Sequence, residues 1–178
     1  MMDEPIEEEL AILAERTVRK PGPVVDTRTL EQPISRLSPR PPLCVEQNAT
    51  LADAVVTMRE HRVGCVLVVD DAGYLVGIFT ERDLLLRLDD GDLSRGIQPY
   101  MTSDPETLSP GDPIAFALNL MSVGGFRHIP LVDEGGRPLG VVSVKDVVNY
   151  LADVFSQDVL TIPPNPRQAG RWQSRDGA

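Results

Sequence analysis

The sequence repeats itself. Most residues from Ile34 to Leu88 are matched 63 positions later by a residue of the same kind, with no insertion or deletion. A repeated unit that cannot cover its apolar face alone buries this face against its neighbour. We therefore expect one paired module with pseudo-twofold symmetry and two equivalent clefts at the seam. The matches include Met58 with Met121, Val69 with Val132, Gly73 with Gly136, Gly77 with Gly140, Thr80 with Ser143 and Asp83 with Asp146.

The first copy predicts the order strand, helix, strand, strand and helix. Residues 43–45 are a short apolar strand, and the helix after it has apolar residues at spacings of four and three, with Asn48 or Thr50 as its N-cap. Residues 65–69 are apolar and β-branched, as in a strand covered on both faces. A turn and residues 75–79 complete a hairpin, after which a second helix begins.

The second copy predicts the same elements. We expect a strand near 106–108, a helix over 113–121, a hairpin around 133–136 and a last helix over 144–155. Pro113 suits a first helical turn, where a missing N–H is harmless. The predicted fold class is α/β (α+β), built from two β-α-β-β-α repeats.

Composition excludes several classes of function. The 178 residues include 27 acidic and 17 basic side chains, and a net charge of -10 disfavours binding to the phosphates of nucleic acid. The acidic start, Met1 to Pro5, is unlike a signal peptide, and no apolar run reaches the length of a membrane span. The sequence therefore predicts a cytoplasmic protein that binds neither nucleic acid nor membrane.

No catalytic or metal-binding constellation stands out in the sequence. Cys44 and Cys65 lie among apolar residues without a CxxC spacing, so we interpret both as buried free thiols. His61, late in a helix, is interpreted as a surface residue. No nucleophile with a paired base, no metal ligand set and no Gly-rich phosphate loop can be assembled, so we expect no enzyme activity.

The repeated unit resembles the CBS domain, named after cystathionine β-synthase, and two such units in tandem resemble a Bateman module. The resemblance divides the chain into an acidic extension and linker (1–33), a first repeat (34–92), a second repeat (93–160) and a flexible tail (161–178). It rests on Ala54 and Met58 with Val68-Val69-Asp70, Gly73 and Val76 to Leu84 in the first copy, and on Ala117 and Met121 with Arg127 to Asp133 and Leu139 to Val147 in the second.

The resemblance implies an adenosine-containing regulatory ligand of the AMP, ADP or ATP class, with no obligatory cofactor. In the family, the Asp of a T/S-x-x-D motif accepts hydrogen bonds from the ribose hydroxyls, and the Ser or Thr helps to hold the ribose or phosphate. This assigns ribose binding to Thr80, Asp83, Ser143 and Asp146. The same pattern also describes a capping box, which needs no ligand, and the sequence leaves both interpretations open.

Phosphate binding needs cations, and the resemblance points to Arg127 and His128, with Arg82 and Lys145 as additions. The positions in the first copy that match Arg127 and His128 are uncharged, so the two clefts are not equivalent, and we expect Asp146 to matter more than Asp83. The adenine would lie between strand edges. The residues predicted to line these slots, all of which would serve equally as core, are Cys44, Val45, Val66 and Ile78 in one cleft and Leu108, Ile129 and Val141 in the other.

The two ends differ from the repeats. Residues 1–16 are acidic with a helical apolar stripe, and residues 163–178 carry three arginines and the only tryptophan, Trp172. The tail is interpreted either as disordered or as a partner anchor.

The sequence leaves two functions open. One is a regulatory sensor that acts on a separate effector protein; the other is a ligand-free structural or dimerisation module whose Asp residues are helix caps. Both predict a homodimer, as is common for Bateman modules, because the last helix of each copy is rich in apolar residues. These residues are Leu84, Leu85, Leu88, Val147, Val148, Leu151 and Phe155.

Overall fold

The structure is a computed structural model that describes residues 27–87 and 91–154. The acidic segment 1–16, Leu88, Phe155 and the predicted tail therefore lie outside the described residues. Two short helices precede the first strand, α2 (Thr27–Leu30) and the 3-10 helix η1 (Ile34–Leu37). The first copy then forms β1 (Cys44–Glu46), α3 (Leu51–His61), β2 (Cys65–Val69), β3 (Leu75–Thr80) and α4 (Glu81–Arg87).

The second copy has the same order with one difference. The strand predicted near 106–108 is reduced to a single parallel bridge between Leu108 and Leu131. In the first copy the Leu67 N–H donates to the Leu43 carbonyl, but the residue that matches Leu67 is Pro130, which has no N–H to donate. The elements of this copy are β4 (Thr102–Ser103), α5 (Ile114–Ser122), β5 (His128–Val132), β6 (Pro138–Ser143) and α6 (Val144–Val154).

Each copy receives an edge segment from the first part of the other copy. β4 of the second copy pairs antiparallel with β3, with Ser103 opposite Gly77. In the second copy, Arg40 takes the corresponding place beside β6, and the Arg40 and Val141 N–H groups each donate to the other residue's carbonyl, over 3.3 and 3.1 Å. This exchange holds the two copies together through backbone hydrogen bonds.

A capping box sets the start of α3. The Thr50 hydroxyl accepts from the Asp53 N–H at 3.2 Å, and the Asp53 carboxylate accepts from the Thr50 N–H at 2.9 Å. Two N–H groups that the helix cannot use are therefore satisfied. Of the two predicted N-caps, Thr50 is the correct one and Asn48 is not.

Alternate residues of the central strands pack into different hydrophobic cores. Val66 and Val68 of β2 point toward α3 and α4, whereas Cys65 and Leu67 face the seam between the copies. The seam core also contains Ile78 and receives Val141 from the second copy. Cys44 is exposed, so its prediction as a buried thiol is wrong, and Cys65 is buried as predicted.

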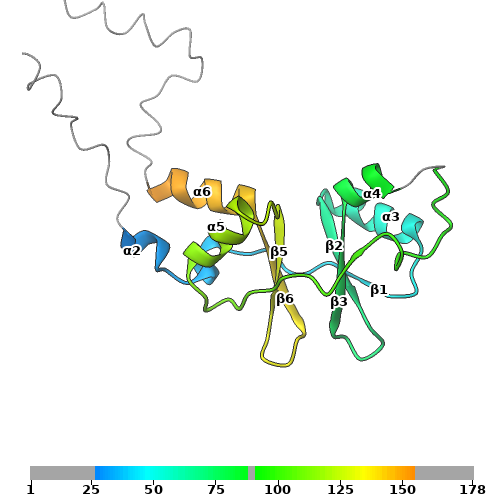
Figure 1. The fold of residues 1–178 in the computed structure, drawn as a ribbon, viewed down its shortest axis with the longest axis horizontal. Helices are drawn as coiled ribbons and strands as arrows, with labels where there is room; N and C mark the ends of the chain where they lie inside the picture. Colours follow the sequence, from blue (N-terminus) through cyan, green and yellow to red (C-terminus); the bar gives the residue numbers. More distant parts are fainter. Residues whose placement is uncertain (1–26, 88–90, 155–178) are drawn as a thin grey trace, which may run out of the picture.

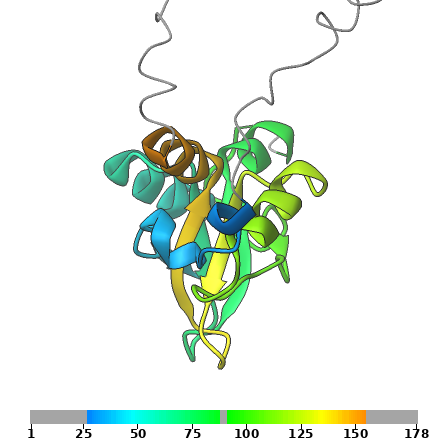
Figure 2. The same cartoon turned by 90° about the vertical axis from the view of Figure 1, so that its left-hand side faces the viewer.

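Helices and hairpin turns lie at opposite ends of the molecule. Figure 1 shows the turn between β2 and β3 and the turn between β5 and β6 reaching the same lower end, and Figure 2 shows the helices gathered at the other end. The hairpin turns touch, since the Leu75 N–H donates to the Gly136 carbonyl at 3.1 Å. The starts of β2 and β5 and the ends of β3 and β6 therefore lie near the helices. No helix among the described residues has the length and apolar character of a bilayer span.

Candidate ligand-binding clefts

A first cavity, which we call the Asp83 cleft, lies at the seam between the two copies. Its volume is about 400 Å³. The first copy contributes Ile78, Thr80 and Asp83 to its wall, and the second contributes Arg127 and His128. The cleft therefore exists only when both copies are present.

Two further cavities, which together we call the Asp146 cleft, lie on the other side of the seam. An inner part of about 50 Å³ is lined by Ser143 and Asp146 together with apolar side chains, among them Leu43 and Val141. An outer part of about 390 Å³ also includes Ser143 and adds basic side chains. The T/S-x-x-D motifs, 63 residues apart, thus lie in separate clefts.

The two motifs adopt nearly the same geometry. In the Asp83 cleft, Asp83 Oδ2 accepts from the Thr80 N–H at 3.0 Å and from the Thr80 hydroxyl at 2.6 Å. In the Asp146 cleft, the matching distances from Ser143 to Asp146 Oδ2 are 2.8 and 2.6 Å. In each carboxylate, one oxygen therefore accepts the hydrogen bonds at the start of a helix, as a capping box requires.

The second oxygen distinguishes the two carboxylates. Asp83 Oδ1 lies 3.4 Å from the guanidinium of Arg87, one turn further along α4. Within the described ranges, Asp146 Oδ1 has neither a hydrogen bond nor an ion pair, although Asp146 is buried to 9% exposure and lines its cleft. A ligand hydroxyl could use the second oxygen of Asp146 without displacing a protein group.

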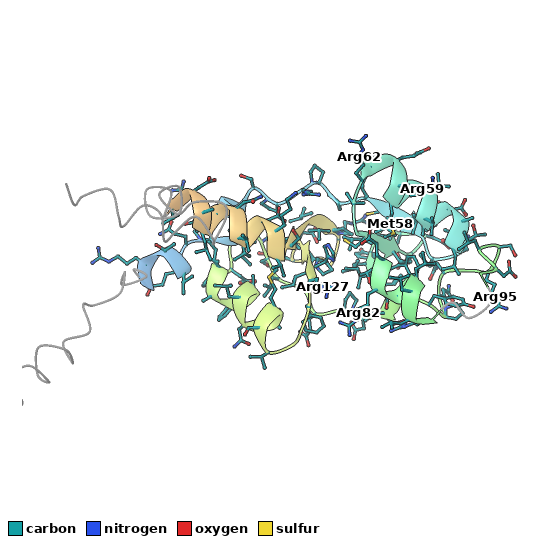
Figure 3. All side chains as sticks on the ribbon, turned by 90° about the horizontal axis from the view of Figure 1, so that it is seen from above. Met58, Arg59, Arg62, Arg82, Arg95 and Arg127 are labelled. Atoms are coloured by element: carbon teal, nitrogen blue, oxygen red, sulfur yellow. The ribbon has the colours of Figure 1, made fainter. Side chains whose placement is uncertain are left out.

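The cations predicted for phosphate lie at the seam, but Arg127 does not belong to the Asp146 cleft alone. Arg127 and His128 line both the Asp83 cleft and the outer part of the Asp146 cleft, whereas Arg82 lines only the first and Lys145 only the second. Figure 3 shows Arg127 and Arg82 near the boundary between the halves. The assumption that Arg127 serves only the cleft of its own copy is therefore wrong, and the expectation that Asp146 matters more than Asp83 stays a prediction.

His128 differs from the other predicted cations because it is half-buried, whereas Arg82, Arg127 and Lys145 are exposed. Its ring packs over Gly64, where an added Cβ would lie 3.2 Å from the His128 Cε1 atom. Burial lowers the pKa of His128 below its usual 6.5; nearby Glu81 and Asp146 act in the opposite direction. We therefore expect His128 to act as a neutral hydrogen-bonding group near pH 7 rather than as a positive charge.

Two of the seven residues predicted for adenine slots line a cleft, Ile78 in the Asp83 cleft and Val141 in the Asp146 cleft. Cys44 is exposed and lines neither cavity. The other four are core residues of a single copy, and two of them are at most 1% exposed, so a ligand could reach those two only by repacking the core. These four are Val45, Val66, Leu108 and Ile129.

Five charged residues that were not predicted as site residues also line the clefts. Arg40 and Arg62 belong to the outer part of the Asp146 cleft, and Glu81, Arg87 and Glu106 belong to the Asp83 cleft. Arg40 lies outside the elements of either copy and reaches the second copy by the strand exchange. Aligning the copies would have revealed Arg62, because its counterpart 63 residues later is Gly125.

No group of three or more potential metal ligands occurs within residues 27–87 and 91–154. The site chemistry supported by this part of the chain is therefore that of hydrogen bonds and charge, with carboxylates and basic side chains around two small clefts.

Comparison with known proteins agrees with this architecture. An uncharacterised 17.7 kDa protein of Acidianus ambivalens is 33% identical over 69% of this chain and 75% of its own length. The chain spans 44% of the length of a relative from Methanocaldococcus jannaschii and 59% of the length of one from Methanopyrus kandleri. A CBS domain protein of Pyrobaculum aerophilum, solved in complex with AMP, superposes with a TM-score of 0.61 at 27% identity, over 70% of this chain and 98% of that one.

A second solved structure gives the same result. The CBS-domain protein of Agrobacterium tumefaciens is 28% identical and has a TM-score of 0.59, over 66% of this chain and 96% of that one. The profile of the CBS domain matches twice, at residues 34–90 and 95–153. Two matches of this extent, on two copies of the β-α-β-β-α fold, show that the chain belongs to the CBS-domain family and carries a tandem pair of these domains.

Proposed function

We propose that the chain is a regulatory module that binds an adenosine-containing ligand, of the AMP, ADP or ATP class, in the clefts between its two CBS domains. The observation that carries the proposal is the carboxylate in each cleft, Asp83 or Asp146, with one oxygen fixed by the preceding hydroxyl residue. A carboxylate held in one orientation suits the vicinal hydroxyls of a ribose, because its oxygens accept hydrogen bonds in a fixed plane.

The AMP complex of the Pyrobaculum aerophilum relative supports this choice of ligand class. The composition of the cleft walls also fits this ligand class. Apolar side chains stand beside each carboxylate, Ile78 in the first cleft and Leu43, Val63 and Val141 in the second. An apolar wall next to a few polar groups is the usual composition of a small-molecule site.

Ligand binding at the seam would change the relation of the two domains. Because both domains line each cleft, an occupant that contacts both favours one angle between them. We infer that this angle, read by a separate effector protein, is the signal. Homodimerisation through exposed apolar residues of α4 and α6 is the second part of the proposal.

The alternative is a ligand-free structural module in which the aspartates serve only as caps. A third capping box in the chain separates the two functions, because Thr50 and Asp53 form the same hydrogen bonds but line none of the three cavities described above. Asp53→Ala therefore removes a cap without touching a cleft, and it is the matched control for Asp83→Ala and Asp146→Ala.

The test is isothermal titration of adenosine, AMP, ADP and ATP against the wild type and these three variants. A ligand at about a hundred times its dissociation constant stabilises the fold by about 2.7 kcal/mol, so thermal shift serves as a first screen. We expect all three variants to lose thermal stability, because each loses a cap. Only Asp83→Ala and Asp146→Ala should also lose affinity; affinity equal to that of Asp53→Ala would leave the structural module as the explanation.

A further inference from the structure

The charged side chains around the outer part of the Asp146 cleft are all positive. Its lining includes Arg40, Arg62, Arg127 and Lys145 and no acidic side chain. Within the described part of the chain, none of these four forms an ion pair with a carboxylate. Four unpaired cations around a cavity of about 390 Å³ attract a ligand with several negative charges.

The wall of the Asp83 cleft carries positive and negative charges in equal number. Three arginines line it, Arg82, Arg87 and Arg127, but so do three carboxylates. Arg87 is also occupied: it pairs with Asp83 and donates to the carbonyls of Tyr100 and Met101 at 3.1 and 2.8 Å. An added phosphate would meet carboxylates as well as cations here. The three carboxylates are Glu81, Asp83 and Glu106.

Comparison of equivalent positions shows where this asymmetry arises. Glu106 of the Asp83 cleft corresponds to Leu43, and Glu81 corresponds to Val144, so two acids of one cleft are apolar residues in the other. In the opposite direction, Arg62 of the Asp146 cleft corresponds to Gly125. Both kinds of difference make the Asp146 cleft more positive.

The backbone at Arg62 gives an independent reason to assign it a role. Arg62 ends α3 in the left-handed conformation with φ of 54°, which glycine adopts more readily than any residue with a Cβ. Its counterpart Gly125 has the same sign of φ, 71°, and is glycine. A strained non-glycine residue at the mouth of a charged cavity is a reason to look for function in its side chain.

We propose that the Asp146 cleft selects adenosine ligands with a di- or triphosphate, and that Arg62, Arg40 and Lys145 are the residues that hold the added phosphates. The Asp83 cleft gains no affinity from phosphates beyond the first. This inference rests on the proposed function and deepens it, because it assigns different ligand classes to two clefts built from one repeated motif. Guanidinium groups match phosphate oxygens in pairs, which favours Arg at two of these positions.

The test is titration of adenosine, AMP, ADP and ATP in magnesium-free buffer at low salt against the wild type, Arg62→Gly, Lys145→Gln and the control Arg59→Gln. Arg59 lies one turn before Arg62 on the same helix, as Figure 3 shows, and lines none of the three cavities described above. We expect wild-type affinity to rise from AMP to ATP. Arg62→Gly and Lys145→Gln should each weaken ATP binding about tenfold, or about 1.4 kcal/mol, with adenosine affinity unchanged.

The melting temperature of Arg62→Gly is a second readout, and it distinguishes a binding role of Arg62 from a structural one. Because glycine relieves the left-handed backbone, its melting temperature should equal or exceed that of the wild type while ATP affinity falls. Adenosine binding with no gain from AMP to ATP, or an ATP loss in Arg59→Gln as large as in Arg62→Gly, would overturn the inference and leave the proposed function intact. Absence of binding by any adenosine compound would overturn both.

Discussion

Tyr74 and Arg137 occupy equivalent positions in the two CBS domains and stack on each other across the pseudo-twofold axis. The Arg137 Cζ atom lies 4.7 Å from the centroid of the Tyr74 ring. Each residue follows the left-handed glycine of its hairpin turn, Gly73 or Gly136. The contact therefore joins the two hairpin turns at the end of the molecule opposite the clefts, so movement that opens or closes the clefts can pivot about this end.

The first prediction concerns the strength of this contact. A guanidinium over an exposed aromatic ring contributes about 0.5–1 kcal/mol, and Tyr74 is 41% exposed. In a double-mutant cycle of Tyr74→Ala and Arg137→Ala, urea unfolding should give a coupling energy in this range. If the two single changes simply add, the stacked pair makes no net contribution.

The second prediction compares two equivalent glycines, Gly77 and Gly140, which lie against the exchanged edge segments. A Cβ on Gly140 would lie 2.9 Å from the Arg40 carbonyl oxygen, whereas a Cβ on Gly77 would meet the flexible side chain of Met101. Backbone cannot move aside as a methionine can. We expect Gly140→Ala to lower the free energy of unfolding by about 1–3 kcal/mol, and Gly77→Ala to lower it less. Equal losses in chemical denaturation would contradict this account of the strand exchange.

The third prediction concerns the pH dependence of stability. Burial places the folded-state pKa of His128 below 6.5, its usual value in an unfolded chain. Between these two pKa values the unfolded chain binds more protons, so His128 lowers the free energy of unfolding as pH falls through this window. The slope is at most about 1.4 kcal/mol per pH unit, the limit for a single proton.

The control for this prediction is His128→Gln, which keeps a hydrogen-bonding side chain but cannot gain the proton. Between pH 7 and pH 5, its free energy of unfolding should fall less steeply than that of the wild type. Parallel curves would mean that the acid sensitivity comes from groups other than His128.

The fourth prediction concerns assembly through the last helix of each domain. Leu85 and Leu86 of α4 are 81% and 67% exposed, and Val148 of α6 is 56% exposed. We expect a homodimer in light scattering at micromolar concentration, and a monomer for Leu85→Glu. Leu139→Glu is the control, because Leu139 is 50% exposed in β6, away from these helices. A monomeric wild type, or an equal effect of Leu139→Glu, would contradict the proposed interface.

The internal repeat made the fold predictable to a useful degree. Periodicity indicates α3 and the β-branched run of residues 65–69 indicates β2, and the repeat extends these predictions to the second copy. The edge segments could not be predicted, because Arg40 and Ser103 pair with strands of the other copy and neither has a local pattern that indicates a strand. The exposure of Cys44 was missed for another reason. β1 is a short edge strand, and apolar neighbours in the sequence do not show which of its residues faces outward.

The two predicted aspartates, Asp83 and Asp146, line the clefts, and so do three of the predicted cations, Arg82, Arg127 and Lys145. The sequence missed Arg40, Arg62 and Arg87. It could not divide the cations between clefts, because Arg127 and His128 lie at the seam and line both. The predicted adenine slots failed in part for a physical reason. Val66 and Ile129 alternate with cleft-facing residues on their strands, and only the seam face of a strand reaches a ligand.

The exchange of edge segments has a consequence for biosynthesis. Arg40 leaves the ribosome long before its partner Val141 is made, so it has no pairing partner while the first domain is being synthesised. The first sheet, in turn, is complete only after β4 has emerged, which belongs to the second domain. A stop codon between the copies would therefore release a product with an unpaired edge, a form prone to aggregation.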